Sequence, residues 1–245
     1  MGGQLHHPGV TDGLDDVYGR SSAGGSIHWV QTETRHVVLT YDDGPQPGGT
    51  DSVLEALAEY QASATFFVLI SRVERYRHLL EEVIAAGHEI GLHGVDHRRL
   101  PDFPAHEVAA RTGEARDRLQ EIIGQPVTWF RPPYGAQSLE TWHAVVSTGL
   151  TPVLWSHSLR DWQTVPDETR HDIAVDSARP GSIMLAHDGF AGPQDGAYDG
   201  TPPDIDRGAL ARSLLEVYRA ADLQGSSLTQ ALRTGSAGMK VRLTS

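Results

Sequence analysis

The sequence predicts an α/β domain folded as a distorted (β/α) barrel of the TIM-like type. Short apolar segments of strand character alternate with longer amphipathic segments from residue 36 onward, and the chain carries six or seven such units. This alternation implies parallel strands joined by right-handed crossovers. The number of units favours a barrel over an open sheet, although the sequence pattern alone does not separate the two. In addition, unusual polar residues follow the strands, where such barrels build their active sites.

The expected elements follow one another along the chain. Strands are expected at residues 36–41, 64–69, 88–93, 127–131, 151–155 and 182–186, with a weaker seventh candidate near 226–229. Apolar residues recur on one helical face at 51–60, 72–86, 104–123 and 207–223, so helices are expected there. Gly87 is expected to end the second helix as its C-cap. These elements form one domain, residues 36–235, between an irregular Gly-, Asp- and Ser-rich segment, 1–35, and a tail, 236–245.

Length and composition exclude several classes of protein. The 245 residues suffice for one large domain with a buried core, and no flexible linker divides the middle of the chain. The net charge of -12 argues against nucleic acid as a partner, because phosphate binding needs clustered Lys and Arg. The absence of cysteine excludes disulfides, thiolate metal ligands and a cysteine nucleophile.

Hydropathy also carries an expectation about the compartment. The first residues show no basic segment followed by an apolar one, and no apolar run approaches the ~20 residues that a membrane helix needs. We therefore expect no membrane contact and a cytoplasmic protein, or a secreted one if a leader was trimmed. The oligomeric state is left open.

Two segments contain candidate metal ligands. HGVDH at 93–97 places two histidines four residues apart, where both can turn toward one point, and a catalytic metal site needs about three protein ligands. TYDDGP at 40–45 places adjacent carboxylates after a strand, where burying both is costly without a cation nearby. Taken singly, each has an ordinary alternative, namely two surface histidines and a polar turn.

Three further features follow later strands. RPPYG at 131–135 is expected to form a rigid loop, either a plain connector or a platform that presents side chains and backbone N–H groups. Asp161 and Trp162 follow the fifth strand, and His187 follows the sixth, as either a structural or a titrating histidine. Because all these features come in order, each after a successive strand, we expect them to form one site.

These residues together resemble the NodB-homology polysaccharide deacetylases, the fourth family of carbohydrate esterases. The five motifs of that family are matched over about residues 36–230 by TYDDGP, HGVDH, RPPYG, the pair Asp161-Trp162 and LAH at 185–187. The resemblance implies a distorted barrel that is commonly seven-stranded. It also implies one divalent metal ion, zinc before cobalt, nickel or iron, held by Asp43, His93 and His97.

The resemblance assigns a role to each remaining residue. Asp42 is similar to the general base that takes a proton from the attacking water, and Arg131 would pair with it and keep it ionised. His187 would protonate the departing amine, with Asp161 orienting or tuning it. The remaining residues would bind substrate, the oxyanion through the backbone N–H of Tyr134 and the acetyl methyl through a pocket lined by Trp162 and Leu185.

Two positions depart from the family pattern. Gly94 replaces a Ser or Thr whose hydroxyl braces the loop of the two histidines, so the brace is expected to be absent or supplied elsewhere, for example by Asp96. Ser158 stands where the family often has a second Asp, which bears on substrate choice. The long acidic and Gly-rich stretch after His187 is expected to form a loop over the site.

The expected function is therefore metal-dependent removal of an N-linked acetyl group from an N-acetylated amino sugar or oligosaccharide. One alternative keeps the chemistry but acts on a small soluble metabolite as a deacylase or amidohydrolase. A second alternative is a carbohydrate-binding barrel without turnover. The presence of Asp42 beside the three candidate ligands favours an enzyme over the binding protein.

Overall fold

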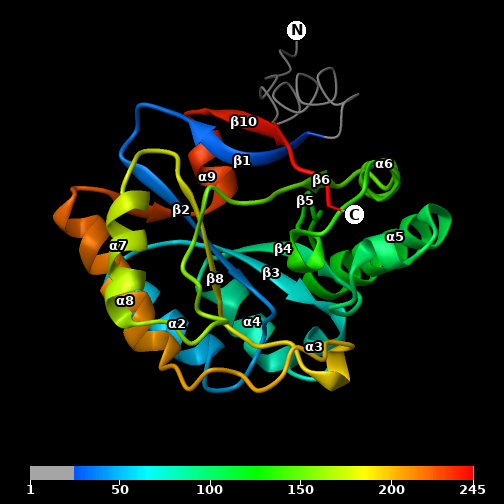
Figure 1. Cartoon of the computed structure of the whole chain (residues 1–245), viewed down its shortest axis with the longest axis horizontal. Coiled ribbons are helices and arrows are strands. Elements are labelled where there is room, and N and C mark those ends of the chain that lie inside the picture. The colour runs from blue at the N-terminus through cyan, green and yellow to red at the C-terminus, as the bar shows by residue number, and fades with distance from the viewer. Residues whose placement is uncertain (1–24, 245) are drawn as a thin grey trace, which may run out of the picture.

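The computed structural model describes residues 25–244 and has one parallel sheet at its centre (Figure 1). Seven strands follow the spatial order β6-β5-β4-β3-β2-β8-β7, and β9 (Gln224–Ser226) pairs with β2 beside this path. Their bounds are β2 (His36–Asp42), β3 (Thr65–Leu69), β4 (Glu89–Gly94), β5 (Trp129–Phe130), β6 (Thr151–Pro152), β7 (His157–Ser158) and β8 (Ile183–His187). All these ladders are parallel, and the sheet curls into a half-barrel, so the predicted α/β fold class is confirmed.

The helices pack around the outside of this sheet. They are α2 (Thr50–Glu59), α3 (Ile70–Val73), α4 (Arg77–Ala85), α5 (Ala105–Ile123), α6 (Leu139–Ser147), α7 (Asp167–Ser177), α8 (Arg207–Ala220) and α9 (Leu228–Leu232). In the part of the chain that the structure describes, three short 3-10 turns accompany them, η2 (Leu100–Asp102), η3 (Pro133–Gly135) and η4 (Pro193–Asp195). Within residues 25–244, none of these helices combines the length and apolar character needed to cross a membrane.

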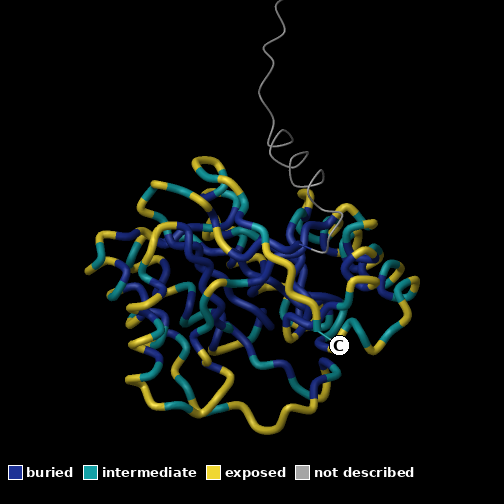
Figure 2. Tube along the Cα trace, turned by 45° about the horizontal axis from the view of Figure 1, so that its top comes forward, coloured by how far each residue is buried: buried dark blue, intermediate teal, exposed yellow. Residues whose placement is uncertain are grey.

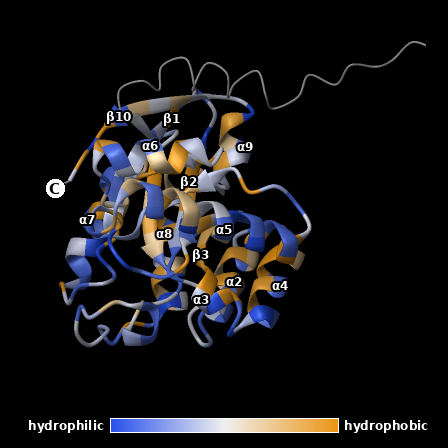
Figure 3. Cartoon of the chain, turned by 90° about the vertical axis from the view of Figure 1, so that its right-hand side faces the viewer, coloured by the Kyte–Doolittle hydropathy of each residue, from blue (hydrophilic) through white to orange (hydrophobic). Residues whose placement is uncertain are grey.

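The core lies between the sheet and the helices. Val37, Leu39 and Phe66 on the strands pack with Leu57 of α2 and Leu80 of α4, all of them buried. Figure 2 shows buried residues gathered at the centre of the trace and exposed ones on the outer loops. Figure 3 shows hydrophobic residues concentrated on β2 and β3 and on the neighbouring helices α2 and α4. Burial of this apolar surface is the main force that stabilises the layered arrangement.

The register of the central strands determines where the polar residues lie. In the parallel ladders of β2, Asp42 is the partner of Phe67 on β3 and of His187 on β8. At the end of β4, a register shift pairs Gly94 with Leu69. The carboxyl ends of β2, β4 and β8 therefore lie at the same edge of the sheet, which is the edge where parallel α/β proteins bind ligands.

The expectation of an irregular N-terminal segment and a plain tail is wrong where the structure describes them. Residues 25–31 form strand β1 (Gly25–Gln31), which pairs antiparallel with β10 (Ser236–Val241), while residues 1–24 lie outside the described part. The two strands are about 200 residues apart in sequence, so no local pattern reveals their pairing. β1 also joins the barrel, because the Leu154 N–H donates to the Ile27 carbonyl (2.7 Å). The division into domains at residue 36 stays a prediction.

Other elements agree in place but differ in extent. The helix expected at 72–86 is divided into α3 and α4 at Tyr76, whose φ of -129° leaves the helical range. Gly87 does follow the end of α4 with a φ of 80°, as expected for a residue that ends a helix. The weak seventh strand lies at 224–226 as β9, and residues 228–232 form α9 instead. Helices α6 and α7 were not predicted, and α7 has no clear apolar face, because only Arg170, Ala174 and Ser177 of its residues are buried.

Candidate active site

The predicted site residues meet in one cavity of about 390 Å³ at the carboxyl ends of the strands. Eight of the ten line it, namely Asp42, Asp43, His93, His97, Tyr134, Trp162, Leu185 and His187. The other two, Arg131 and Asp161, are fully buried and bind Asp42 and His187 respectively. The structure therefore brings together all ten residues that the sequence selected.

Asp43 stands at the centre of the candidate metal ligands. Its φ of 73° turns the chain sharply after β2, and its Oδ2 accepts a hydrogen bond from the Ala191 N–H (3.2 Å). Its Oδ1 lies 3.4 Å from Nε2 of His93 and 3.3 Å from Nε2 of His97. One ligand atom from each residue lies within 4.8 Å of the others. Two imidazoles and a carboxylate arranged in this way are the donor set of a catalytic divalent metal.

The surroundings of the three ligands fit a cation. Oδ1 of Asp43 is buried without a hydrogen-bond donor among the described residues, which is costly unless a positive charge sits beside it. Nδ1 of His93 donates to the Arg131 carbonyl (2.8 Å), and this leaves the lone pair of Nε2 facing Asp43. Burial alone would raise the pKa of Asp43, but His97 and His93 hold it well below its usual range, so the carboxylate is ionised.

Asp42 and Arg131 form a buried ion pair behind the metal ligands. The guanidinium donates from Nη1 to Oδ1 of Asp42 (2.7 Å) and to Oγ1 of Thr40 (2.8 Å). It also donates to the carbonyls of Val153 (3.2 Å) and Leu154 (2.9 Å). These bonds supply acceptors for the donors of the buried Arg131 guanidinium. They leave Oδ2 of Asp42 on the cavity side, 4.0 Å from Nε2 of His93.

His187 lies on β8 and is bound to Asp161 twice. Oδ1 of Asp161 accepts from Nδ1 of His187 (2.7 Å), and Oδ2 accepts from the backbone N–H of His187 (2.7 Å) and from Arg207 (3.1 Å). Burial alone would lower the pKa of His187, but the charge and hydrogen bond of Asp161 raise it to about 9. At neutral pH the ring therefore carries both protons, and Nε2 can donate one into the cavity. The Trp162 ring packs edge-on against it, 5.5 Å between centroids.

The structure explains why a hydroxyl residue is absent at position 94. Gly94 has a φ of 125°, and a Cβ there would lie 3.0 Å from the Asp96 carbonyl oxygen. The turn between the two histidines is instead held by Asp96, whose carboxylate accepts from Arg98 (2.7 Å) and from Arg111 of α5 (2.8 Å). The brace expected from the family pattern is thus supplied in part by Asp96.

Restoring the family residue at this position is expected to destabilise the protein. We expect Gly94→Ser to lower the free energy of unfolding by about 1–3 kcal/mol, because an L side chain at this φ is strained. Urea unfolding of the metal-free protein measures the loss. Gly113→Ser in α5 is the matched control, since a Cβ there meets only Thr148 at 3.8 Å. Equal stability of Gly94→Ser and the wild type would contradict this interpretation of the turn.

The second departure, Ser158, leaves Asp161 as the carboxylate of this corner. Ser158 pairs with Leu185 in the ladder between β7 and β8, and its hydroxyl is buried without a partner among the described residues.

Sequence reasoning missed the residues that complete the site, namely Trp155, Phe190, Ala191, Asp199 and Arg207. Four of these five lie in or just after the stretch that follows His187, which was expected to form a loop over the site.

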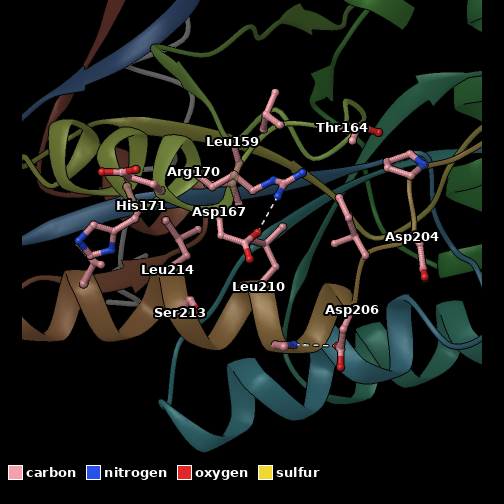
Figure 4. A pocket seen from close by; sticks show the side chains of 17 residues that line it. Leu159, Thr164, Asp167, Arg170, His171, Asp204, Asp206, Leu210, Ser213 and Leu214 are labelled. Atoms are coloured by element: carbon pink, nitrogen blue, oxygen red, sulfur yellow. Dashed lines mark hydrogen bonds and ion pairs between the residues drawn. The ribbon is translucent and has the colours of Figure 1, made fainter.

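A larger cavity lies between α7 and α8, about 850 Å³ in volume (Figure 4). Its charged side chains serve the local structure, since Arg170 donates to Asp167 (2.9 Å) and Asp206 caps α8 by accepting from the Ala209 N–H (2.9 Å). None of the ten predicted residues lines it. Within residues 25–244, the metal-ligand geometry occurs at Asp43 and the two histidines and not here. The smaller cavity is therefore the candidate active site.

Comparisons with known proteins show which family the chain resembles. A chitooligosaccharide deacetylase of Azorhizobium caulinodans is 40% identical over 154 residues, which is 62% of this chain and 73% of the relative. A peptidoglycan-N-acetylglucosamine deacetylase of Bacillus cereus is 32% identical over 168 residues, 67% of this chain and 78% of the relative. The peptidoglycan deacetylase PdaC from Bacillus subtilis has a similar structure, with a TM-score of 0.67 and 27% identity over 82% of this chain and 92% of that one.

A second solved structure supports the fold alone. The family 4 carbohydrate esterase from Streptomyces lividans in complex with acetate has a TM-score of 0.69 and 20% identity, covering 84% of this chain and 98% of that one. A sequence model described as polysaccharide deacetylase matches residues 30–153, half of the chain. The matched range carries the metal-ligand segments and the RPPYG loop. The chain belongs to the polysaccharide deacetylase family.

Proposed function

We propose that this protein removes the N-acetyl group from an N-acetylated amino sugar within an oligosaccharide or glycan. The observation that carries the proposal is the placement of Asp42 and His187 beside the Asp43-His93-His97 cluster in one cavity. Relatives that match most of their own length are chitooligosaccharide and peptidoglycan-N-acetylglucosamine deacetylases. The substrate class is therefore an acylated amino sugar rather than an arbitrary small amide.

We propose zinc as the metal, because two imidazole nitrogens and one carboxylate oxygen suit its tetrahedral geometry and leave one position open. When bound, a divalent ion lowers the pKa of water to about 7 and polarises the acetyl carbonyl. The chain's contribution is to hold the three ligands in place. Nδ1 of His93 is fixed on the Arg131 carbonyl, and Oδ2 of Asp43 is fixed on the Ala191 N–H.

Proton transfer is proposed to run between two groups of the cavity. Asp42 accepts the proton of the attacking water, and Arg131 holds this carboxylate in one orientation. His187, protonated because of Asp161, donates the proton that the leaving amine requires. A base and an acid held ready in opposite protonation states are what amide cleavage needs.

Substrate binding is proposed to use the remaining cavity walls. Leu185 is buried on β8 and Trp162 is partly exposed beside His187, so together they offer an apolar recess for the acetyl methyl. The backbone N–H of Tyr134 is proposed to bind the oxyanion from the rigid η3 turn, whose φ at Tyr134 is 61°. Removal of such a donor typically slows catalysis about 100- to 1000-fold.

The proton-donor role of His187 predicts the alkaline side of the pH profile. Deacetylation is expected to continue while His187 is protonated and to fall as the pH rises through its pKa, about 9 without metal. A bound cation would repel the imidazolium and so lower the pH at which activity falls. Asp161→Asn is expected to lower this pH further, because it removes the charge that raises the pKa of His187. The pH dependence of kcat/KM measures both, and an identical limb in wild type and Asp161→Asn would exclude this role.

The test of the proposed function is metal-dependent release of acetate. Protein stripped with a chelator and reloaded with zinc or cobalt is incubated with chitooligosaccharides, peptidoglycan fragments and small N-acetylated metabolites. Acetate released from the amino sugars by reloaded but not by stripped protein is the expected result. Acetate from the small metabolites alone would favour the alternative substrate class. Sugar binding with no release from any compound would favour a binding protein instead.

A further inference from the structure

The short helix α3 lies beneath the loops that carry the candidate metal ligands. Just before it, the Leu69 N–H donates to the carbonyl of Gly44 (3.2 Å), the residue after Asp43. Within it, the Ser71 N–H donates to the Val95 carbonyl (3.0 Å), in the turn between the two histidines. Both ligand-bearing segments, the loop with Asp43 and the turn between His93 and His97, are thus bound to one turn of backbone.

Arg72 extends this attachment to the loop that follows His187. Arg72 is 5% exposed, and its Nε and Nη2 both donate to Oδ2 of Asp195 (3.0 and 2.8 Å). Its Nη1 donates to Oε1 of Gln46 (2.6 Å), and Nη2 also donates to the Phe190 carbonyl (2.5 Å). A planar guanidinium with several donors in fixed directions can bind three residues of two loops at once, which a lysine cannot do.

Asp195 accepts these hydrogen bonds, and its loop in turn contacts the candidate metal ligands. It is 1% exposed, and its Oδ1 also accepts from Ser71 (2.9 Å) and Arg75 (3.2 Å). Its backbone carbonyl accepts from the His97 N–H (2.7 Å). Four residues earlier, the Ala191 N–H binds Oδ2 of Asp43. The loop held by the Arg72–Asp195 pair therefore contacts two of the three candidate ligands directly.

We propose that Arg72 and Asp195 are positioning residues that fix Asp43 and His97 relative to one another and thereby set the affinity for the metal. The proposal rests on the proposed metal site. In the family pattern, a hydroxyl at position 94 would brace the turn between the two histidines from within. Gly94 has no side chain, and the Arg72–Asp195 pair braces the same turn from outside the cavity. Neither residue lines the candidate active-site cavity, so their effect is expected on metal binding and, through it, on the reaction.

The experiment compares Arg72→Met and Arg72→Lys with the wild type. Arg118→Met is the control, because it removes an exposed arginine that pairs with Glu121 and Glu74. The dissociation constant for Co²⁺ is measured by competition with a chelating dye, and the visible absorption spectrum of bound Co²⁺ reports ligand geometry. Arg72→Met is expected to weaken binding about 10- to 100-fold, the typical effect of losing a group that orients a metal ligand. Arg72→Lys is expected to retain part of the affinity for Co²⁺, since it keeps the positive charge but loses the planar set of guanidinium donors.

The outcomes separate this proposal from the proposed function. A wild type that binds no Co²⁺ would overturn both. A wild type that binds one equivalent, with both variants within twofold and spectrally unchanged, would overturn the positioning role alone, even if the melting temperature of the metal-free variants fell. Asp195 keeps Ser71 and Arg75 as donors in Arg72→Met. If that variant still does not fold, Arg72→Lys decides the question by the same two measurements.

Discussion

Replacing Asp42 with asparagine is expected to lower kcat/KM for acetate release by about 10²- to 10⁴-fold, the usual contribution of a general base. A carboxamide has nearly the same shape but cannot take a proton from water. Its oxygen can still accept the hydrogen bond that Arg131 now donates to Oδ1. Because Asp42 is outside the metal-ligand cluster, the variant is expected to bind about one equivalent of metal, as the wild type would.

Two measurements keep this prediction specific. Asp42→Asn leaves the buried Arg131 without its counter-charge, and breaking a buried ion pair costs about 3–5 kcal/mol, so folding must be checked by circular dichroism at the assay temperature. Asp172→Asn makes the same chemical change on an exposed position of α7 and is expected to be inert. Full activity of a folded, metal-loaded Asp42→Asn protein would show that another group is the base.

His97→Ala is expected to abolish stable metal binding and to reduce acetate release at least about 10²- to 10³-fold. The substitution leaves one imidazole and one carboxylate, one ligand fewer than a catalytic site uses. Oδ1 of Asp43 would lose the neighbour now 3.3 Å away. Metal content after dialysis, measured by atomic absorption, is expected to fall from about one equivalent toward zero, in parallel with activity.

An exposed histidine provides the control for this variant. His106 lies on the solvent side of α5, so His106→Ala is expected to keep both metal and activity. The His97 ring also packs against Tyr134, 4.3 Å between centroids, and for this reason substrate affinity should be compared as well. A His97→Ala protein that keeps a full equivalent of tightly bound metal would show that the cation lies elsewhere.

The parts of the fold that the sequence predicted are those with a local pattern. β2 and β4 were expected because each is a short apolar run bounded by polar residues, and α5 because its apolar positions recur with helical spacing. The site followed from the fold, since the carboxyl ends of parallel strands meet at one edge. Asp42 and His187, 145 positions apart, become partners in the β2–β8 ladder for this reason.

The parts that were missed depend on long-range pairing. β1 resembles an irregular segment until β10 pairs with it from the other end of the chain. Arg207 and Asp199 are single charged residues in polar surroundings, and nothing in their neighbourhood distinguishes them from solvated side chains. Arg72 is the first residue of a segment expected to be helical, where an arginine is unremarkable. Its positioning role becomes visible only through its ion pair with Asp195, far along the chain.

The hydrogen bond between the Tyr134 hydroxyl and Oδ2 of Asp199 (2.5 Å) joins two loops that both line the cavity. A cavity of about 390 Å³ is at the lower end of ligand sites and accommodates little more than one or two sugar rings at a time. Because the bond ties two lining loops together, we expect it to obstruct a chain that extends on both sides of the reacting sugar more than a chain end. Terminal sugars of a defined oligosaccharide are therefore expected to be deacetylated before interior ones. The Asp199→Ala variant is expected to reduce this difference in rate.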